Sequence, residues 1–450
     1  MSYFARWRLL GRTARLYLLH VALQTFSLAI FGLFFNFAIL ALGFPIEFLG
    51  LLNTASFAAA AALSAPLLWL VTRLSLRWTL LASALLQLVS VLLFAGFATP
   101  APLLLASAIG GVAAVLFDVS ASPFMMRHSD EETRDLLFSA NAAIRIGVAG
   151  AGSLLAGQIP ALAGALLGVP AASAPAYRLT LALAAVGLAL AIVPLLLISG
   201  RRGVSGRQVA LGAEQLVDDQ LNASAAGESQ TTNEFHALSP KSQAPSPVSQ
   251  APQRIWRELI RHPIPLFKLL LSPALISVGA ALLIPYLNLF FRQRFAVGDQ
   301  ALGAIFAGLG IATGLASLSA PAISARIGKI RTIVWAQALA LPFLVVMGLS
   351  PTLSVAIGAA LARAALFNMG TPLYDAFAME RTQPAARPTV IGLLNGAASL
   401  GYAFGPLLST RIQAAYGFGP LFVATGLCYA LAVLAKYWFF IRRAVDEERV

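Results

Sequence analysis

The chain has 450 residues, of which 59% are hydrophobic and only 11% charged. Its apolar residues fall into continuous blocks of about twenty, the length that a helix needs to cross the hydrocarbon core of a bilayer. This pattern excludes a soluble globular domain and a transmembrane barrel, whose strands would be short and alternating.

Ahead of the first block, aromatic residues interleave with arginines over residues 3–15, which predicts an amphipathic arm at the inner membrane leaflet. The sequence then predicts an all-α membrane protein with twelve transmembrane helices, six on either side of one long polar gap. We expect these spans at residues 16–42, 48–71, 78–98, 102–126, 136–158, 179–199, 266–291, 300–324, 332–350, 353–378, 389–413 and 419–441. The first span is too long for the core of a signal peptide, so we expect it to be retained.

The formal net charge of +13 would suit a nucleic-acid partner, but its distribution indicates membrane topology. With the N-terminus inside, 25 of the 31 Lys and Arg residues fall in cytoplasmic segments, 4 outside and 2 within spans. Such a bias sets the orientation of membrane proteins. We therefore expect a multi-pass protein of the cell (plasma or inner) membrane with both termini cytoplasmic and no nucleic-acid partner.

The two groups of six spans share short sequence patterns, which predicts two parallel repeats about an axis along the membrane normal. The offset between matching positions drifts from 249 to 256, as small loop insertions would produce. The clearest matches are Leu33-Phe34-Phe35 with Leu289-Phe290-Phe291, Ser64-Ala65-Pro66 with Ser319-Ala320-Pro321, and Leu116-Phe117-Asp118 with Leu366-Phe367-Asn368.

Short basic loops follow the second and eighth spans, and with the two repeats they make the sequence resemble the major facilitator superfamily. Arg73 and Arg77 match the basic positions of that family's loop pattern, as do Arg326 and Arg331 in the second copy. Both copies depart from the pattern, because Thr72 and Ala325 stand where the family has an acid. The resemblance implies two six-helix bundles that rock against each other, with the first and fourth spans beside a central cavity.

Residues 200–264 are rich in Ser, Gln, Ala and Pro and contain few aromatics, which predicts a cytoplasmic, largely disordered linker. The expected domains are thus an N-terminal bundle at 1–199 with a short cytoplasmic arm, the linker at 200–264, and a C-terminal bundle at 265–450 with a short cytoplasmic tail.

Residues that would carry enzyme chemistry are scattered. The four histidines lie in four different segments, the single cysteine, Cys428, is in the last span, and no phosphate-binding Gly-x-x-x-x-Gly-Lys-Ser/Thr loop is present. We expect no catalytic residue, no metal site and no cofactor.

The fourth and fifth spans each carry one charge. Asp118 and Arg145 lie equally far from the loop that joins these spans, so a helical hairpin would place them at one depth. Gln24 of the first span lies at the same level, ~14 Å into the membrane from the inner end. One hypothesis makes Asp118 and Arg145 a cavity pair that binds substrate or exchanges protons, and the other makes them a structural ion pair.

The second repeat places Asn368 and Ser399 where the first has Asp118 and Arg145, and it adds Arg363 near the midplane. Three partners are open for Arg363: an anionic group of the substrate, backbone carbonyls, or an acid not foreseen from the sequence. Further candidate hydrogen-bonding groups in the cavity are Tyr286, Asn288 and Tyr402.

Charged residues at the inner helix ends are candidates for a cytoplasmic gate that holds an outward-open state; ordinary solvated loop charges are the alternative. They are Arg73, Arg77, Arg134, Arg326, Arg331, Glu380, Arg381 and Arg387.

These observations predict a secondary active transporter, monomeric, that moves a small solute by alternating access. Proton coupling would use Asp118, whereas a uniporter or an ion-independent exchanger is equally compatible with the residues. The alternative function is a transporter-derived sensor or partner-binding membrane protein that does not transport. The intramembrane arginines favour an anionic or hydroxyl-rich solute, and the abundant aromatic and aliphatic residues favour amphipathic compounds.

Overall fold

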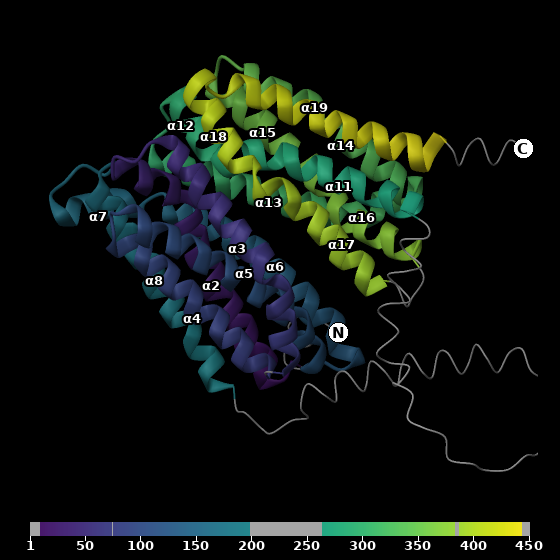
Figure 1. Cartoon of the computed structure of the whole chain (residues 1–450), viewed down its shortest axis with the longest axis horizontal. Helices are drawn as coiled ribbons and strands as arrows, with labels where there is room; N and C mark the ends of the chain where they lie inside the picture. The colour runs from purple at the N-terminus through teal and green to yellow at the C-terminus, as the bar shows by residue number, and fades with distance from the viewer. Residues whose placement is uncertain (1–9, 74, 199–262, 383–386, 443–450) are drawn as a thin grey trace, which may run out of the picture.

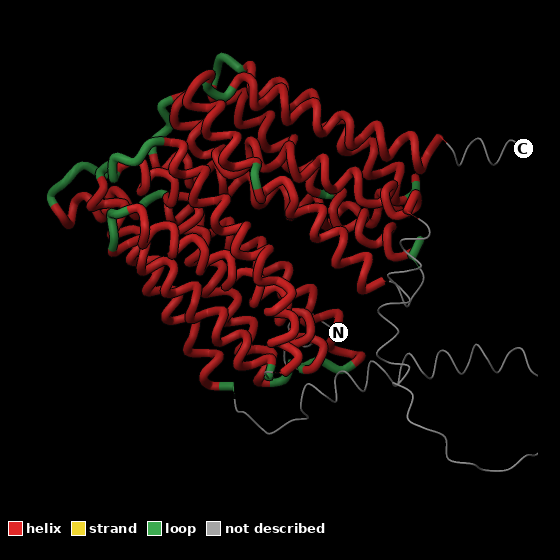
Figure 2. Tube along the Cα trace, viewed as in Figure 1, coloured by secondary structure: helices red, strands yellow, loops and turns green. Residues whose placement is uncertain are grey.

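The computed structural model describes residues 10–73, 75–198, 263–382 and 387–442. All regular structure in these ranges is helical (Figure 2), so the all-α prediction is confirmed. The predicted N-terminal arm up to residue 9, nearly all of the linker and the last eight residues lie outside the described ranges.

The described part of the first half of the chain forms seven helices, two of which share the fifth span. They are α2 (Arg12–Ala41), α3 (Ile46–Arg73), α4 (Leu76–Gly96), α5 (Pro100–Arg127), α6 (Glu131–Ala156), α7 (Ile159–Leu167) and α8 (Ala174–Leu197). The hairpin turn between α5 and α6 is fixed by a capping box, in which the backbone N–H of Thr133 donates to the Asp130 carboxylate (2.9 Å) and the backbone N–H of Asp130 donates to the Thr133 hydroxyl (3.2 Å).

The second half contains more interruptions. Its helices are α11 (Pro263–Leu283), η2 (Ile284–Tyr286), α12 (Leu287–Phe295), α13 (Asp299–Ile327), α14 (Lys329–Leu349), α15 (Leu353–Asn368), α16 (Gly370–Glu380), α17 (Arg387–Leu400), η4 (Gly401–Ala403), α18 (Gly405–Tyr416), α19 (Gly419–Lys436) and η5 (Tyr437–Arg442). Pro285 and Pro406 lie at two of these breaks, where a residue without a backbone N–H is tolerated because neighbouring groups satisfy the freed carbonyls.

Eleven helical stretches of the described chain are long and apolar enough to cross a membrane. The predicted eleventh span, 389–413, is present as α17, η4 and α18, a helix interrupted at Gly401–Ala403. The spans thus correspond to the twelve expected from the sequence.

The two halves form separate bundles that meet at one end and diverge toward the other (Figure 1). One buried hydrophobic cluster joins both halves, with Phe34 and Tyr177 of the first packed among Phe290, Phe291 and Leu302 of the second. Toward the other end the core divides into one cluster of first-half residues only and one of second-half residues only. We call the joined end the closed end and the divided end the open end.

Glycines allow the two halves to approach closely at the closed end. A Cβ on Gly50 of α3 would lie 2.1 Å from the hydroxyl of Thr410 and 2.8 Å from the carbonyl of Pro406, on α18. A Cβ on Gly303 of α13 would lie 2.6 Å from the carbonyl of Ser153, on α6. Small residues at these crossings let the helix backbones approach closely.

Candidate functional site

Gln24, Asp118 and Arg145 line one cavity of about 170 Å³, which we call the charged cavity. They come from α2, α5 and α6, so the common level predicted from the sequence places the three side chains around one space. Its remaining lining residues are Thr25, Leu28, Gln87, Ala113, Ala114 and Phe117.

The two charges of this cavity are close but do not form an ion pair. Both side chains are exposed, and in the described part of the chain no salt bridge joins Asp118 to Arg145. The Arg145 guanidinium instead lies over the ring of Phe117, 5.8 Å from its centroid. Because Asp118 and Arg145 face one cavity, their opposite charges still act on each other.

A second cavity of about 330 Å³ adjoins the first and shares Leu28 and Gln87 with it. We call it the amide cavity, because Asn36, Asn53 and Gln87 line it. Its other lining residues are Phe31, Gly32, Phe35, Ser56, Ser90, Phe94, Ser107, Gly110 and Pro285. All but Pro285 belong to the first half, so the cavity lies among α2, α3, α4 and α5 and is bounded by η2.

Tyr286 and Asn288 contact the first half at the closed end. The Asn36 amide donates to the Asn288 side-chain oxygen (2.9 Å) and to the Pro285 carbonyl (2.8 Å), and the Asn288 amide donates to the Leu33 carbonyl (2.9 Å). The Tyr286 hydroxyl accepts from Asn53 (3.4 Å) and donates to the Pro406 carbonyl (3.3 Å). Both predicted residues therefore join the two halves, next to the amide cavity.

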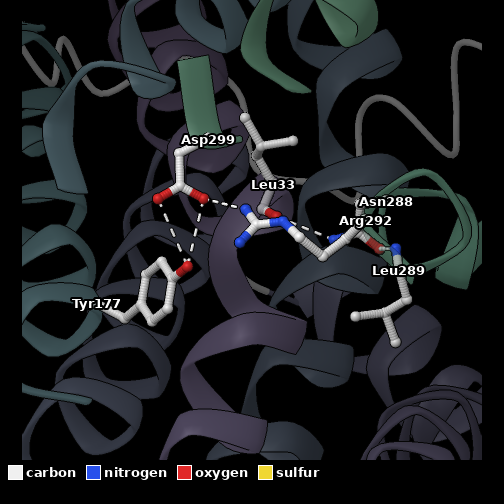
Figure 3. Close-up of polar contacts among 6 residues, drawn as sticks. All are labelled: Leu33, Tyr177, Asn288, Leu289, Arg292 and Asp299. Carbon is white, nitrogen blue, oxygen red and sulfur yellow. Dashed lines mark hydrogen bonds and ion pairs between the residues drawn. The ribbon is translucent and has the colours of Figure 1, made fainter. Parts of the chain in front are cut away.

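A charged cluster also connects the halves at the closed end (Figure 3). Arg292 of α12 forms an ion pair with Asp299, the first residue of α13. The Tyr177 hydroxyl, from α8 of the other half, donates to the same carboxylate at 3.3 Å. The Arg292 guanidinium lies 4.5 Å from the ring centroid of Phe37, on α2. We call these four residues the closed-end cluster.

Arg363 lies within the second half, where it is only 7% exposed. Its guanidinium donates to the Tyr429 hydroxyl (3.0 Å) and lies over the rings of Phe367 and Tyr429, at 5.3 and 5.7 Å from their centroids. A tyrosine hydroxyl is a partner that the sequence alternatives for Arg363 did not include.

The other second-half candidates, Asn368, Ser399 and Tyr402, differ in their surroundings. The Asn368 amide donates to the Thr313 hydroxyl (3.3 Å), which joins α15 to α13. Ser399 is exposed on α17. Tyr402 of η4 packs against Phe57 of α3, with ring centroids 4.8 Å apart, and so contacts the first half.

Three of the predicted gate residues, Arg77, Glu380 and Arg381, make contacts within their own halves. Arg77 donates to the last carbonyls of α8, at Leu195 (3.3 Å) and Leu196 (3.0 Å), and so caps that helix. Glu380 forms an ion pair with Lys329, and the Arg381 guanidinium lies 4.6 Å from the ring centroid of Phe377.

Arg134 is half-buried, and its Nε has no hydrogen-bond partner among the described residues. Arg326 and Arg331 are exposed. The side chains of Arg73 and Arg387 lie outside the described part of the structure.

Sequence reasoning missed several residues that build the site. Asn36, Asn53 and Gln87 are neutral, so the presence of a charge within a span does not identify them. Asn36 lies one residue after Leu33-Phe34-Phe35, and Asn288 lies one residue before the matching Leu289-Phe290-Phe291. That arrangement was a signal that the two repeats meet at this motif. Lys436, one of the 25 Lys and Arg residues expected in cytoplasmic segments, is instead buried near the end of α19 and donates to Gln337 (2.7 Å).

Solved structures of several transporters share the fold of this chain. A bacterial homologue of the human lysosomal transporter Spinster, in an inward-facing and unoccupied conformation, superposes with a TM-score of 0.68 at 16% identity, covering 98% of this chain and 95% of that chain. The nucleoside transporter NupG gives 0.68 at 14% identity (96% and 100% covered), and the D-xylose-proton symporter gives 0.67 at 15% (97% and 98%).

At these identities the solved structures establish a shared fold only. A search of curated proteins found no match. The sequence model of the Major Facilitator Superfamily matches residues 18–276 and 269–450, and so covers nearly the whole chain. The chain therefore belongs to the major facilitator superfamily.

Proposed function

We propose that this membrane transporter is a secondary active transporter that moves a small solute by alternating access. One observation carries the proposal: the hydrophobic core is continuous across the halves at the closed end and divided at the open end. Between these ends lie two adjoining cavities, one of which holds the exposed charges of Asp118 and Arg145. Rocking of the halves would close the open end and open the other.

The described part of each half begins and ends at the open end. The first half begins with α2 and ends with α8, and the second begins with α11 and ends with η5. If the termini are cytoplasmic, as the distribution of basic residues predicts, the conformation is inward-open. The Spinster homologue with a similar fold was captured in an inward-facing conformation. We propose a monomer in the cell membrane, with bundles at 1–199 and 265–450 and a linker between them.

The direct test is substrate counterflow in proteoliposomes, with a panel of labelled amino acids, nucleosides and sugars. Uptake that exceeds that of protein-free liposomes, and that saturates with the solute, supports a transporter. A solute that stabilises the purified protein but shows no counterflow supports the sensor instead, which the absent loop acids at Thr72 and Ala325 favour. Conversion of any solute into a new product would contradict the expectation that the protein is not an enzyme.

Proton coupling through Asp118 is the finer proposal for the driving force. Asp118 is the carboxylate that lies in the charged cavity, where a proton could reach it from the open end. An imposed pH gradient should then drive uphill flux in the wild type. The Asp118→Asn variant should lose this uphill flux for any solute that it still carries downhill in counterflow. Uphill, pH-driven flux that persists in Asp118→Asn would exclude this residue as the coupling site.

A further inference from the structure

The charged cavity presents two opposite charges that, among the described residues, no salt bridge joins. Asp118 and Arg145 are both exposed and both line the same space. Phe117 holds the Arg145 guanidinium over its ring, 5.8 Å from the centroid, and so gives this cation a contact other than the carboxylate. The other polar lining residues, Gln24, Thr25 and Gln87, are neutral. The cavity lining therefore has one positive and one negative group and no net charge.

The transport cycle makes this arrangement selective. While the cavity is open, water solvates both charges, but closing the open end removes that water, and a buried charge without a partner is strongly unfavourable. A solute with one net charge would pair with one residue and leave the other without a partner. A solute that carries both an ammonium and an anionic group would satisfy Asp118 and Arg145 together.

The adjoining amide cavity indicates what the rest of such a solute is like. It is lined by Phe31, Phe35 and Phe94, whose ring centroids lie 5.0–5.6 Å from one another, and by no charged residue. The Asn36 amide already donates to Pro285 and Asn288, and the Ser107 hydroxyl donates to the Leu52 carbonyl. The lining thus offers phenyl rings, acceptor oxygens and the side-chain amide of Gln87 to an uncharged body.

We propose that the solute is an amphipathic zwitterion, with its ammonium at Asp118, its anionic group at Arg145 and its uncharged body in the amide cavity. This inference rests on the proposed transport function and names its substrate class. The cavities, of about 170 and 330 Å³, together fall in the range of small-molecule sites. A pairing of Asp118 with Arg145 during closure, without any solute, is the competing explanation.

The test uses compounds that share one body and differ in charge. For each of phenylalanine, leucine and 6-aminohexanoate, the panel contains the zwitterion, the amide (a cation), the N-acetyl acid (an anion) and the N-acetyl amide (neutral). Binding to the full-length purified protein is measured by the shift in thermal unfolding, and transport by counterflow. The wild type should be stabilised most by a zwitterion, and only zwitterions should show saturable counterflow.

Two isosteric variants should then change the preferred charge in opposite directions. Asp118→Asn leaves Arg145 alone in the cavity, so the N-acetyl acid should become the best ligand of that body. Arg145→Gln leaves Asp118 alone, so the amide should become the best ligand. Each variant should weaken zwitterion binding by roughly thirtyfold or more, the usual effect of removing one member of a buried charge pair.

Control variants change the same chemical groups elsewhere. Asp375→Asn on α16 and Arg411→Gln on α18 replace exposed charges outside both cavities, and both should keep the wild-type order of ligands. If a single variant does not fold, the double variant Asp118→Asn with Arg145→Gln restores a neutral lining. The double variant should bind the neutral N-acetyl amide at least as well as the zwitterion.

The outcomes separate the inference from the function on which it rests. The inference is overturned if the wild type shows no preference for a zwitterion, or if both single variants keep the wild-type preference. This holds even when another solute shows flux. If a solute that is not a zwitterion is still transported by the double variant Asp118→Asn with Arg145→Gln, the result would support the competing explanation, in which Asp118 pairs with Arg145 during closure. Absence of counterflow for every solute in the wider panel of amino acids, nucleosides and sugars would overturn the transporter itself.

Discussion

Asn36 of α2 and Asn288 of α12 form a side-chain hydrogen bond of 2.9 Å that joins the two halves of the protein at the closed end. Both side chains are buried, and the Asn288 amide nitrogen donates in turn to the Leu33 carbonyl at 2.9 Å. The contact therefore exists only while the closed end is shut. Separation of the halves would expose the Asn36 and Asn288 side chains to solvent or leave them without a hydrogen-bond partner.

Replacing either asparagine by alanine should weaken the closed end. Interhelical hydrogen bonds in membrane proteins contribute ~0.6 kcal/mol on average and at most ~1.7 kcal/mol, so each of Asn36→Ala and Asn288→Ala should destabilise by about that range. A double-mutant cycle of thermal unfolding should give a coupling free energy of the same size. Asn395→Ala, at an exposed position of α17, is the control. Purely additive effects of Asn36→Ala and Asn288→Ala would contradict an energetic link between the halves.

The close approach at Gly50 leads to a second prediction. In Gly50→Ala the new Cβ would lie 2.1 Å from the Thr410 hydroxyl and 2.8 Å from the backbone of α18, so the halves cannot pack as they do now. Because the clash is between the halves, each bundle should still fold. The conformational equilibrium should shift away from the state in which the closed end is shut. Gly147→Ala on α6, with nothing within 4 Å of its Cβ, should have no such effect.

Gly111→Ala provides the contrasting case for the same measurement. Its Cβ would lie 2.0 Å from the carbonyl of Ser56, and both residues belong to the first half. This variant should lower the thermal stability of the fold itself. Crosslinking between cysteines at the closed end should decrease in Gly50→Ala, whose unfolding temperature should change little. Equal losses of thermal stability in Gly50→Ala and Gly111→Ala would contradict the distinction.

The sequence predicts the helical architecture well because the membrane imposes it. A span must be long and apolar enough to cross the hydrocarbon, and it must satisfy its own backbone hydrogen bonds, so the spans can be located from residue type alone. The level shared by Gln24, Asp118 and Arg145 also follows from helix rise, and these residues do line one cavity.

The partners of individual side chains could not be predicted in the same way. Equal depth suggested an ion pair between Asp118 and Arg145, but depth does not fix helix rotation, and Arg145 lies over Phe117 instead. Tyr286 and Asn288 were expected in the cavity, and next to it they also contact Asn53 and Asn36 of the first half, because they lie at the break of η2. Contacts between the two repeats depend on the conformational state, which no pattern within one span encodes.

The closed-end cluster predicts a conformational effect of Tyr177. Tyr177→Phe removes the hydroxyl that donates to Asp299 across the halves, while the Arg292–Asp299 ion pair stays within the second half. The closed end should therefore open more often, without loss of folding. In a Cys428→Ser background, Ser56→Cys in the amide cavity should react faster with a membrane-impermeant thiol reagent added at the closed end.

Tyr416→Phe is the matched control for this variant, because Tyr416 is 76% exposed at the end of α18. It should leave the labelling rate of Ser56→Cys unchanged. Asp299→Asn should also raise that rate, since it replaces the charged acceptor of the Tyr177 hydroxyl by a neutral, weaker one and removes the ion pair with Arg292. A labelling rate in Asp299→Asn equal to that of the parent would mean that the cluster does not hold the closed end.

Arg363 provides the last prediction, because its geometry separates the roles that remained open for it. The guanidinium is buried against the Tyr429 hydroxyl and two aromatic rings, so Tyr429→Phe should cost about 0.6 kcal/mol of stability and at most ~1.7 kcal/mol. Arg363→Lys should cost more, since a lysine ammonium cannot stack its plane on the rings of Phe367 and Tyr429. Thermal unfolding and counterflow are measured on the same preparations. An Arg363→Lys variant that keeps wild-type stability but loses flux would instead place Arg363 in contact with the solute.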